Sequence, residues 1–160
     1  IKPGDDEARV FFDLYEKIYE TNFTRLKKKE IITHVLGHEP WSFRVTGISV
    51  KACIEIAQND FGHPVGKLAR GHKRSRAETS REVFGRKYKF KEWWRYVWEG
   101  DETVLVTKEE NNNNTERNDD IKLNWQDGYF AGDHIGWKHR MGVEGKKVRE
   151  LCEKHPEIGQ

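Results

Sequence analysis

The sequence predicts an α+β fold, a small mixed sheet packed with several helices, on three observations. From residue 5 to residue 18, apolar side chains recur with the 3.6-residue period of an amphipathic helix, which Asp5 or Asp6 can cap. Trp41, Phe43 and Val45 alternate with polar residues, as in a half-buried strand. Residues 103–107 form a short apolar run that is typical of a buried strand.

Helical periodicity and capping signals predict five more helices. One begins after Ser49, a favourable N-cap, and another begins after Ser75, which forms a capping box with Glu78. The expected helices span about 24–36, 49–60, 76–84, 91–98 and 143–155. Further strands are expected around 121–125, 129–130 and 135–137, and residues 108–120 are expected to form a polar loop.

The chain length suits one domain of 160 residues, which we divide by character. Residues 1–66 form a helical and strand N-terminal half, and residues 67–99 a basic segment. The polar loop 108–120 leads to a candidate active-site module at 121–160, with a ββα-like arrangement of two strands and a helix.

Composition predicts a lean, aromatic core in an intracellular protein. Charged residues make up 35% of the chain and its mean hydropathy is −0.94, against six Trp, eight Phe and five Tyr. No apolar run approaches the roughly 18 residues of a membrane helix, so no membrane partner is expected. Cys53 and Cys152 are far apart and suit free thiols in the reducing cytoplasm better than a disulfide framework.

Charge is distributed unevenly along the chain, although the net charge is only +2. Residues 67–95 hold eleven Lys and Arg against three Glu, which makes this segment +8 and the remainder −6. Such a segment, interleaved with aromatic residues, is suited to a nucleic acid because cations release counterions from phosphates and aromatic rings stack on bases. The alternative is a solvated charged face that the acidic residues of 101–120 neutralise.

We therefore predict a nucleic-acid-binding protein, with duplex DNA the favoured partner over RNA or another polyanion. Tyr88 and Trp93 are the expected base-stacking residues, because Trp94 and Trp98 share the inward face of their helix. His72, Arg74 and Arg76 stand before a helix N-terminus, where phosphate commonly binds. The predicted contact residues are Lys67, Arg70, His72, Lys73, Arg74, Arg76, Arg81, Arg86, Lys87, Tyr88, Lys89, Trp93, Arg95, Lys138 and Arg140.

The C-terminal region carries residues that suit phosphodiester hydrolysis. Asp133 and His134 are adjacent, and His155 follows on the last predicted helix. Asp133 and His155 are the expected ligands of one divalent cation, Mg²⁺ or Mn²⁺, that stabilises charge on the phosphate. His134 would then activate water as a general base.

At these residues the sequence resembles the ββα-metal nucleases of the HNH and endonuclease VII type. The matching stretch is "GDHIGWKHRMG…KKVRELCEKH", about 25 residues, in which Asp133 and His155 correspond to metal ligands and His134 to the general base. Lys154 replaces the family's second helical cysteine, Lys146 stands where HNH proteins carry Asn, and the upstream CxxC is absent. The resemblance implies a small metal-dependent DNA endonuclease of the homing or restriction type, acting as a homodimer.

Several alternatives remain open from the sequence. Asp133 with Glu144-Gly145-Lys146 also has the form of the PD-(D/E)xK nucleases, whose ExK lies on an apolar strand. His34 and His38 are spaced to chelate a metal on one helix face. Asp133 can instead cap a turn and His155 complement a helix dipole. The competing function is a non-catalytic DNA-, RNA- or polyanion-binding accessory module.

Overall fold

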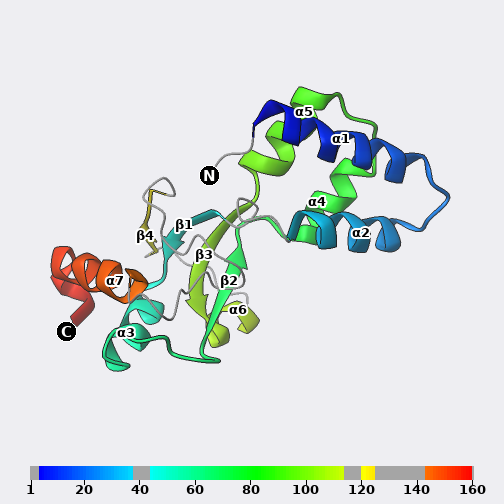
Figure 1. Ribbon diagram of the computed structural model, residues 1–160. Helices are drawn as coiled ribbons and strands as arrows, with labels where there is room; N and C mark the ends of the chain where they lie inside the picture. The colour runs from blue at the N-terminus through cyan, green and yellow to red at the C-terminus, as the bar shows by residue number, and fades with distance from the viewer. Residues whose placement is uncertain (1–3, 38–43, 114–119, 125–142, 160) are drawn as a thin grey trace. The chain divides into compact units, whose positions relative to one another are not determined.

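The computed structural model describes residues 4–37, 44–113, 120–124 and 143–159. These residues contain seven α-helices and a four-stranded mixed sheet, so the predicted α+β class is confirmed. The chain forms two compact units, each built from two separate stretches of sequence (Figure 1). Residues 1–43 and 72–102 make up the helical unit, and residues 44–71 and 103–160 make up the sheet unit.

The helical unit is a small bundle. Helix α1 packs against α2 and α5, and α2 packs against α4. A π-helical turn, η2, continues α5 directly. Figure 1 shows α1 and α2 as an antiparallel hairpin. The bounds are α1 Asp5–Glu20, α2 Arg25–Gly37, α4 Arg76–Val83, α5 Phe90–Trp94 and η2 Arg95–Glu99.

Aromatic side chains form the core of this bundle, as the composition predicts. The Trp93 ring stacks on the Tyr15 ring with 5.2 Å between centroids, and the Phe12 ring lies edge-on to Trp93 at 5.6 Å. Tyr15 and Trp93 are both completely buried. The Tyr15 hydroxyl donates to the Val83 carbonyl at 2.7 Å and accepts from the Tyr88 amide at 3.3 Å, so it joins α1 to the chain between α4 and α5.

The capping signals read from the sequence are confirmed at two helices. The Ser75 side chain accepts from the Glu78 amide at 3.1 Å, and the Glu78 carboxylate accepts from the Ser75 amide at 3.0 Å, which completes the capping box of α4. The Ser49 hydroxyl caps α3 by accepting from the Ala52 amide at 3.1 Å. Helix α1 differs, since it begins at Asp5 after Gly4 and has its acidic residues in the first turn.

The sheet unit carries four strands in the order β2-β3-β1-β4. Strand β1 pairs antiparallel with β4, with Gly47 opposite Lys122. Three helical segments, α3, α7 and the 3₁₀ turn η4, pack on one another beside the sheet. The bounds are β1 Arg44–Ile48, α3 Val50–Gln58, β2 Leu68–His72, β3 Glu102–Thr107, α6 Lys108–Asn113, β4 Ile121–Lys122, α7 Val143–Lys154 and η4 Pro156–Gly159.

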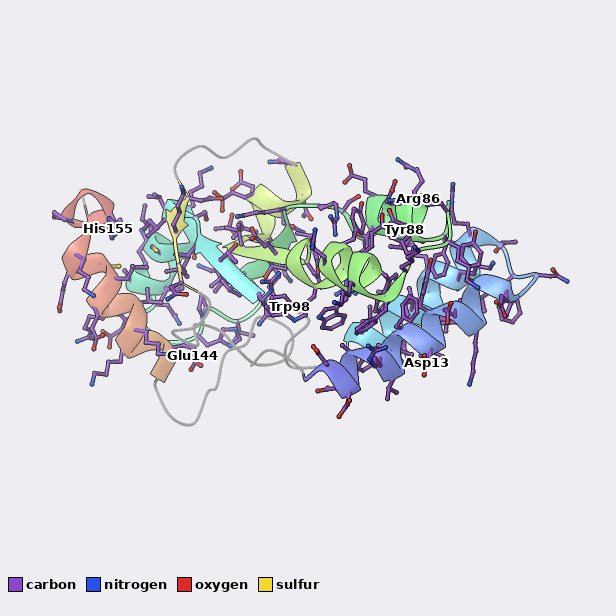
Figure 2. All side chains as sticks on the ribbon, turned by 90° about the horizontal axis from the view of Figure 1, so that it is seen from above. Asp13, Arg86, Tyr88, Trp98, Glu144 and His155 are labelled. Atoms are coloured by element: carbon purple, nitrogen blue, oxygen red, sulfur yellow. The ribbon has the colours of Figure 1, made fainter. Side chains whose placement is uncertain are left out.

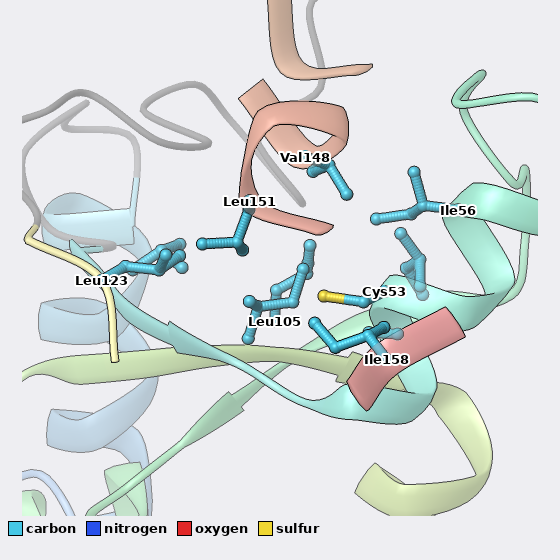
Figure 3. Packing of buried hydrophobic residues seen from close by; sticks show 11 residues of the cluster. Cys53, Ile56, Leu105, Leu123, Val148, Leu151 and Ile158 are labelled. Carbon is cyan, nitrogen blue, oxygen red and sulfur yellow. The ribbon is translucent and has the colours of Figure 1, made fainter. Parts of the chain in front are cut away.

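An aliphatic cluster forms the core of the sheet unit (Figure 3). Cys53 and Ile56 of α3 meet Val148 and Leu151 of α7, and strand residues including Leu105 complete the cluster. Both cysteines are free, and the Cys53 and Cys152 thiols contact each other. Burial, and secondly the neighbouring Cys152, raises the pKa of Cys53 to about 12, so this thiol is a packed, unreactive group.

Two elements differ from the sequence expectation. The predicted loop at 108–120 begins with helix α6, because Thr107 and Glu110 form a capping box of the same type as Ser75 and Glu78. Strand β2 was not predicted, since only Leu68 and Gly71 of its five residues are buried and no apolar alternation is present. Its pairing beside β3 creates the strand.

No helix among the described residues is long and apolar enough to cross a membrane.

The buried Glu110 carboxylate is expected to be a main stabiliser of the sheet unit. It accepts from the Ser49 hydroxyl at 2.7 Å, the Thr107 amide at 2.9 Å and the Thr107 hydroxyl at 3.1 Å. Glu110→Ala leaves these buried donors without an acceptor and should lower the free energy of unfolding by about 2–4 kcal/mol. Urea unfolding followed by circular dichroism measures the change.

The matched control is Glu109→Ala, because Glu109 is exposed on the same helical turn. It should change the free energy of unfolding by less than about 0.5 kcal/mol. Equal effects of the two substitutions would contradict the role of Glu110.

Candidate nucleic-acid interface

Among the described residues, carboxylates from outside the basic segment pair with three of its eleven Lys and Arg. Lys67 pairs with Glu55 at 2.8 Å, Lys73 pairs with Glu102 at 2.6 Å, and Lys87 lies 3.0 Å from Glu20. These acids come from α3, β3 and α1, and all three lie outside residues 67–95. Counted over each whole unit, the charges nearly balance. The helical unit holds 16 Lys and Arg against 14 Asp and Glu, and the sheet unit holds 13 of each. The charge asymmetry along the sequence does not carry over to the two units.

Four cations of the segment keep their charge exposed. They belong to α4, to the N-cap of α5, to α5 itself and to the π-helical turn. None of them forms an ion pair within the part of the chain that the structure describes. They are Arg81, Lys89, Lys91 and Arg95.

An open groove of about 490 Å³ lies in the helical unit, and Arg95 is one of its lining residues. We call it the arginine groove, because three arginines line it together with two tyrosines and two glutamates. Tyr96 and Gly100, which the sequence did not single out, complete its wall, and the π-helical turn presents both Arg95 and Tyr96. Its lining residues are Arg74, Glu82, Arg86, Tyr88, Glu92, Arg95, Tyr96 and Gly100.

Two of the three guanidinium groups are held in position by aromatic rings. The Arg74 guanidinium lies 3.8 Å from the centre of the Tyr96 ring and donates to the Thr79 hydroxyl at 3.1 Å. The Arg86 guanidinium lies 4.0 Å from the centre of the Tyr88 ring, and Figure 2 shows the two side chains together. Stacking keeps each planar group ordered, which favours recognition of an oxyanion. On Arg74, Nη2 also donates to the Tyr96 carbonyl at 2.5 Å, so Nη1 is the guanidinium nitrogen without a hydrogen bond among the described residues.

Carboxylates balance part of this charge. Arg86 lies 2.8 Å from Glu92 and 3.5 Å from Glu82, and the hydrogen bond to Glu92 raises its pKa. The Tyr88 hydroxyl donates to Glu82, which lowers the pKa of Glu82, so this carboxylate stays ionised. The groove therefore presents three positive and two negative groups.

Neither predicted base-stacking residue is available for stacking. Trp93 is completely buried against Tyr15, so the prediction that it faces outward is wrong. In the π-helical turn the hydrogen bonds run from residue i to i+5, which brings Trp93 and Trp98 onto the same inward side. Tyr88 is also buried, and Arg86 covers its ring, so the stacking role predicted for Tyr88 is wrong in this conformation.

The remaining predicted contact residues are divided between the units. Lys67 and Arg70 belong to the sheet unit, and the residues from His72 to Arg95 belong to the helical unit. Arg76 does not extend into solvent as a phosphate ligand would. Its Nε donates to His72 Nε2 at 3.2 Å, and burial lowers its pKa. Lys138 and Arg140 lie outside the described residues.

Only part of the predicted metal site lies within the described residues. Asp133, His134 and His38 lie outside the described residues. His155 directly follows the last residue of α7, where its amide donates to the Cys152 carbonyl at 3.1 Å. Within residues 4–37, 44–113, 120–124 and 143–159, no cluster of three His, Cys, Asp or Glu side chains could hold a metal ion.

The geometry of helix α7 bears on both nuclease hypotheses. Glu144 and His155 lie at opposite ends of it (Figure 2), roughly 16 Å apart at the rise of an α-helix. One cation held by Asp133 therefore cannot use both. Because Glu144, Gly145 and Lys146 form the first turn of a helix, they do not provide the strand-borne ExK of the PD-(D/E)xK enzymes.

A second cavity in the helical unit is too small for a nucleotide. It has a volume of about 50 Å³ between α2, α4 and α5, room for about three to five water molecules. Ser80 Oγ and Trp93 Nε1 on its walls are buried and have no hydrogen-bond partner among the described residues. Ordered water can satisfy both groups.

No protein-family model matches the chain, and no curated protein or solved structure is significantly similar to it.

Alkaline titration tests whether Tyr88 is sequestered. Burial, and secondly its hydrogen bond to Glu82, raises the pKa of Tyr88 from 10.0 to about 12. Between these two values the unfolded chain loses a proton that the folded chain keeps, so stability falls as the pH rises. In a titration followed by tyrosinate absorbance, Tyr88→Phe should remove one tyrosine from the late phase, and Glu82→Gln should shift that tyrosine to lower pH.

A tyrosine free to stack on bases would instead ionise near pH 10. If Tyr88→Phe leaves the late phase unchanged, Tyr88 is not the sequestered residue.

Proposed function

We propose that the helical unit binds nucleic acid, with the sugar–phosphate backbone lying in the arginine groove. The observation that carries this proposal is the convergence of Arg74, Arg86 and Arg95 on one groove, with Lys89, Lys91 and Arg81 exposed nearby in the sequence. Guanidinium groups recognise phosphate bidentately, and two of these three are ordered by tyrosine rings.

The size of the groove supports a nucleotide-sized occupant. Small-molecule and cofactor sites usually measure about 300–1,000 Å³, and the arginine groove, at about 490 Å³, falls within that range. The groove is open to solvent, so a backbone phosphate can reach its arginines.

The ion pairs within the groove do not prevent this. The side chains of Arg86, Glu82 and Glu92 are each about half exposed, and such surface pairs contribute roughly 0–1 kcal/mol. A phosphate that accepts two hydrogen bonds from Arg86 can therefore replace Glu92. Glu82 and Glu92 would then disfavour an acidic protein surface or any polyanion that does not fit the arginines closely, which favours a regular phosphate chain as the partner.

Duplex DNA is the first partner to test, with RNA and single strands alongside it. Arg86→Ala combined with Arg95→Ala removes two phosphate contacts. The slope of log affinity against log salt should fall by about 2, and affinity at low salt should fall at least tenfold. Fluorescence anisotropy with a labelled duplex over a salt series measures both quantities.

The matched control is Lys51→Ala, which removes an exposed cation from α3 in the sheet unit. It should leave affinity and salt slope unchanged. If wild-type protein fails to bind at low salt, where phosphate-driven affinity is strongest, the proposed function is wrong.

The nuclease hypothesis extends this proposal to catalysis. The sequence places Asp133 and His134 before α7, and His155 stands at its end. We propose that Mg²⁺ or Mn²⁺ bound by Asp133 and His155 stabilises the phosphate charge while His134 acts as general base. One such site cuts one strand, so a homodimer would be needed to cut a duplex.

Plasmid DNA with and without Mg²⁺ or Mn²⁺ tests this extension. Nicking should require the metal and fall at least 100-fold in His134→Ala, the usual size of a general-base contribution. Sedimentation of the protein with DNA shows whether two copies act together. Salt-sensitive binding without any nicking would leave a non-catalytic binding module as the function.

A further inference from the structure

The turn between α1 and α2 and the first turn of α2 each expose one large apolar side chain. Phe23 is 52% exposed and Leu26 is 63% exposed, although most other large apolar side chains described in the helical unit are buried or half-buried. The segment 21–29, which we call the hairpin tip, holds both of them. Two exposed apolar side chains are too few to mark an interface by themselves, so their significance depends on the groups around them.

The hairpin tip is also strongly basic. It contains Arg25, Lys27, Lys28 and Lys29 and no acidic residue. Lys27 lies 3.6 Å from Glu30, and Lys28 Nζ donates to the Tyr19 carbonyl at 2.6 Å. Arg25 and Lys29 form no ion pair within the described stretches of the chain. Apolar side chains surrounded by cations suit a partner that carries negative charge on its surface and apolar groups behind that charge.

Contacts within the helical unit place this tip beside the arginine groove. Lys28 lies over the rings of Tyr19 and Phe84, at 5.5 and 6.0 Å from their centres. Lys87 reaches back to Glu16 and Glu20 in the last turns of α1. Residues 84–87 therefore lie against the base of the hairpin, and Arg86 between them is part of the groove. Residues 84–87 thus connect the base of the hairpin with the groove.

We infer that the hairpin tip inserts Phe23, supported by Leu26, against the bases of the nucleic acid whose phosphates occupy the arginine groove. The inference rests on the proposed function. Nucleic acids place stacked aromatic bases behind a row of phosphates, so cations beside an apolar wedge are complementary to them. Tyr88 and Trp93 are buried, and Phe23 takes the stacking role predicted for them.

The test compares Phe23→Ala with a control of the same kind in the same unit. Val10 is 67% exposed on α1, so Val10→Ala removes an exposed apolar side chain away from the tip. Phe23→Ala should weaken binding of a fluorescein-labelled single strand about 5- to 150-fold, the usual cost of losing one stacked base, and Phe23→Trp should preserve it. Val10→Ala should bind like the wild type.

A second readout separates insertion from a general loss of affinity. Oligonucleotides with 2-aminopurine brighten when the probe base is unstacked, so wild-type protein should raise the emission at saturation. Phe23→Ala should not raise it at saturation, even though it still binds in a salt-dependent way. Circular dichroism of each variant confirms the helical content.

The outcomes are distinguishable. If wild-type protein binds but Phe23→Ala binds equally well with the same emission change, the insertion is wrong and the proposed function stands. If wild-type protein binds no oligonucleotide at low salt, the proposed function fails and the insertion fails with it. If Phe23 is needed only for binding vesicles of phosphatidylserine and phosphatidylcholine, the tip is a membrane contact and the inference is overturned.

Discussion

The hydroxyl of Tyr15 joins the parts of the helical unit on which its surface depends. It donates to the Val83 carbonyl at the end of α4 and accepts from the Tyr88 amide before α5, while its ring stacks on Trp93. A chain with so few apolar residues relies on such amphipathic rings, because one residue supplies both buried area and hydrogen bonds. Since residues 84–88 are held at both ends by this hydroxyl, Arg86 and Tyr88 are positioned by the core beneath them.

The aromatic core also explains why acidic residues of other elements offset part of the charge of the basic segment. The segment packs its apolar residues against α1, and α1 brings Glu16 and Glu20 to Lys87. Asp101 and Glu102 approach His72 and Lys73 in the same way, as the alternative of neutralisation by the 101–120 acids predicts. Charge counted along a sequence window therefore overstates the field of a folded surface whenever the partner helix is acidic.

Local signals predicted the elements well, and tertiary contacts account for the rest. Ser49 and Ser75 marked their helices correctly because caps depend on neighbours within three residues. The Thr107–Glu110 box carried the same signal for α6 and was available in the sequence. No local signal predicted strand β2 or the buried position of Trp93. Strand β2 depends on pairing with β3, and the position of Trp93 depends on a π-helical turn. The arginine groove likewise depends on Tyr96 and Gly100, which have no distinguishing local pattern.

A nearly neutral helical unit constrains how it can bind a polyanion. With 16 cations against 14 anions it gains little from long-range attraction, so affinity must come from close contacts. Arginines already ordered on tyrosine rings lose little conformational entropy when they bind phosphate. In the proposed binding mode, Phe23 would add stacking, which salt does not screen. A partner that offers both a fitting phosphate row and an accessible base therefore gains both contributions, whereas a polyanion of equal charge without bases gains only the first. Under the proposed function, the helical unit would therefore prefer a nucleic acid to a polyanion without bases.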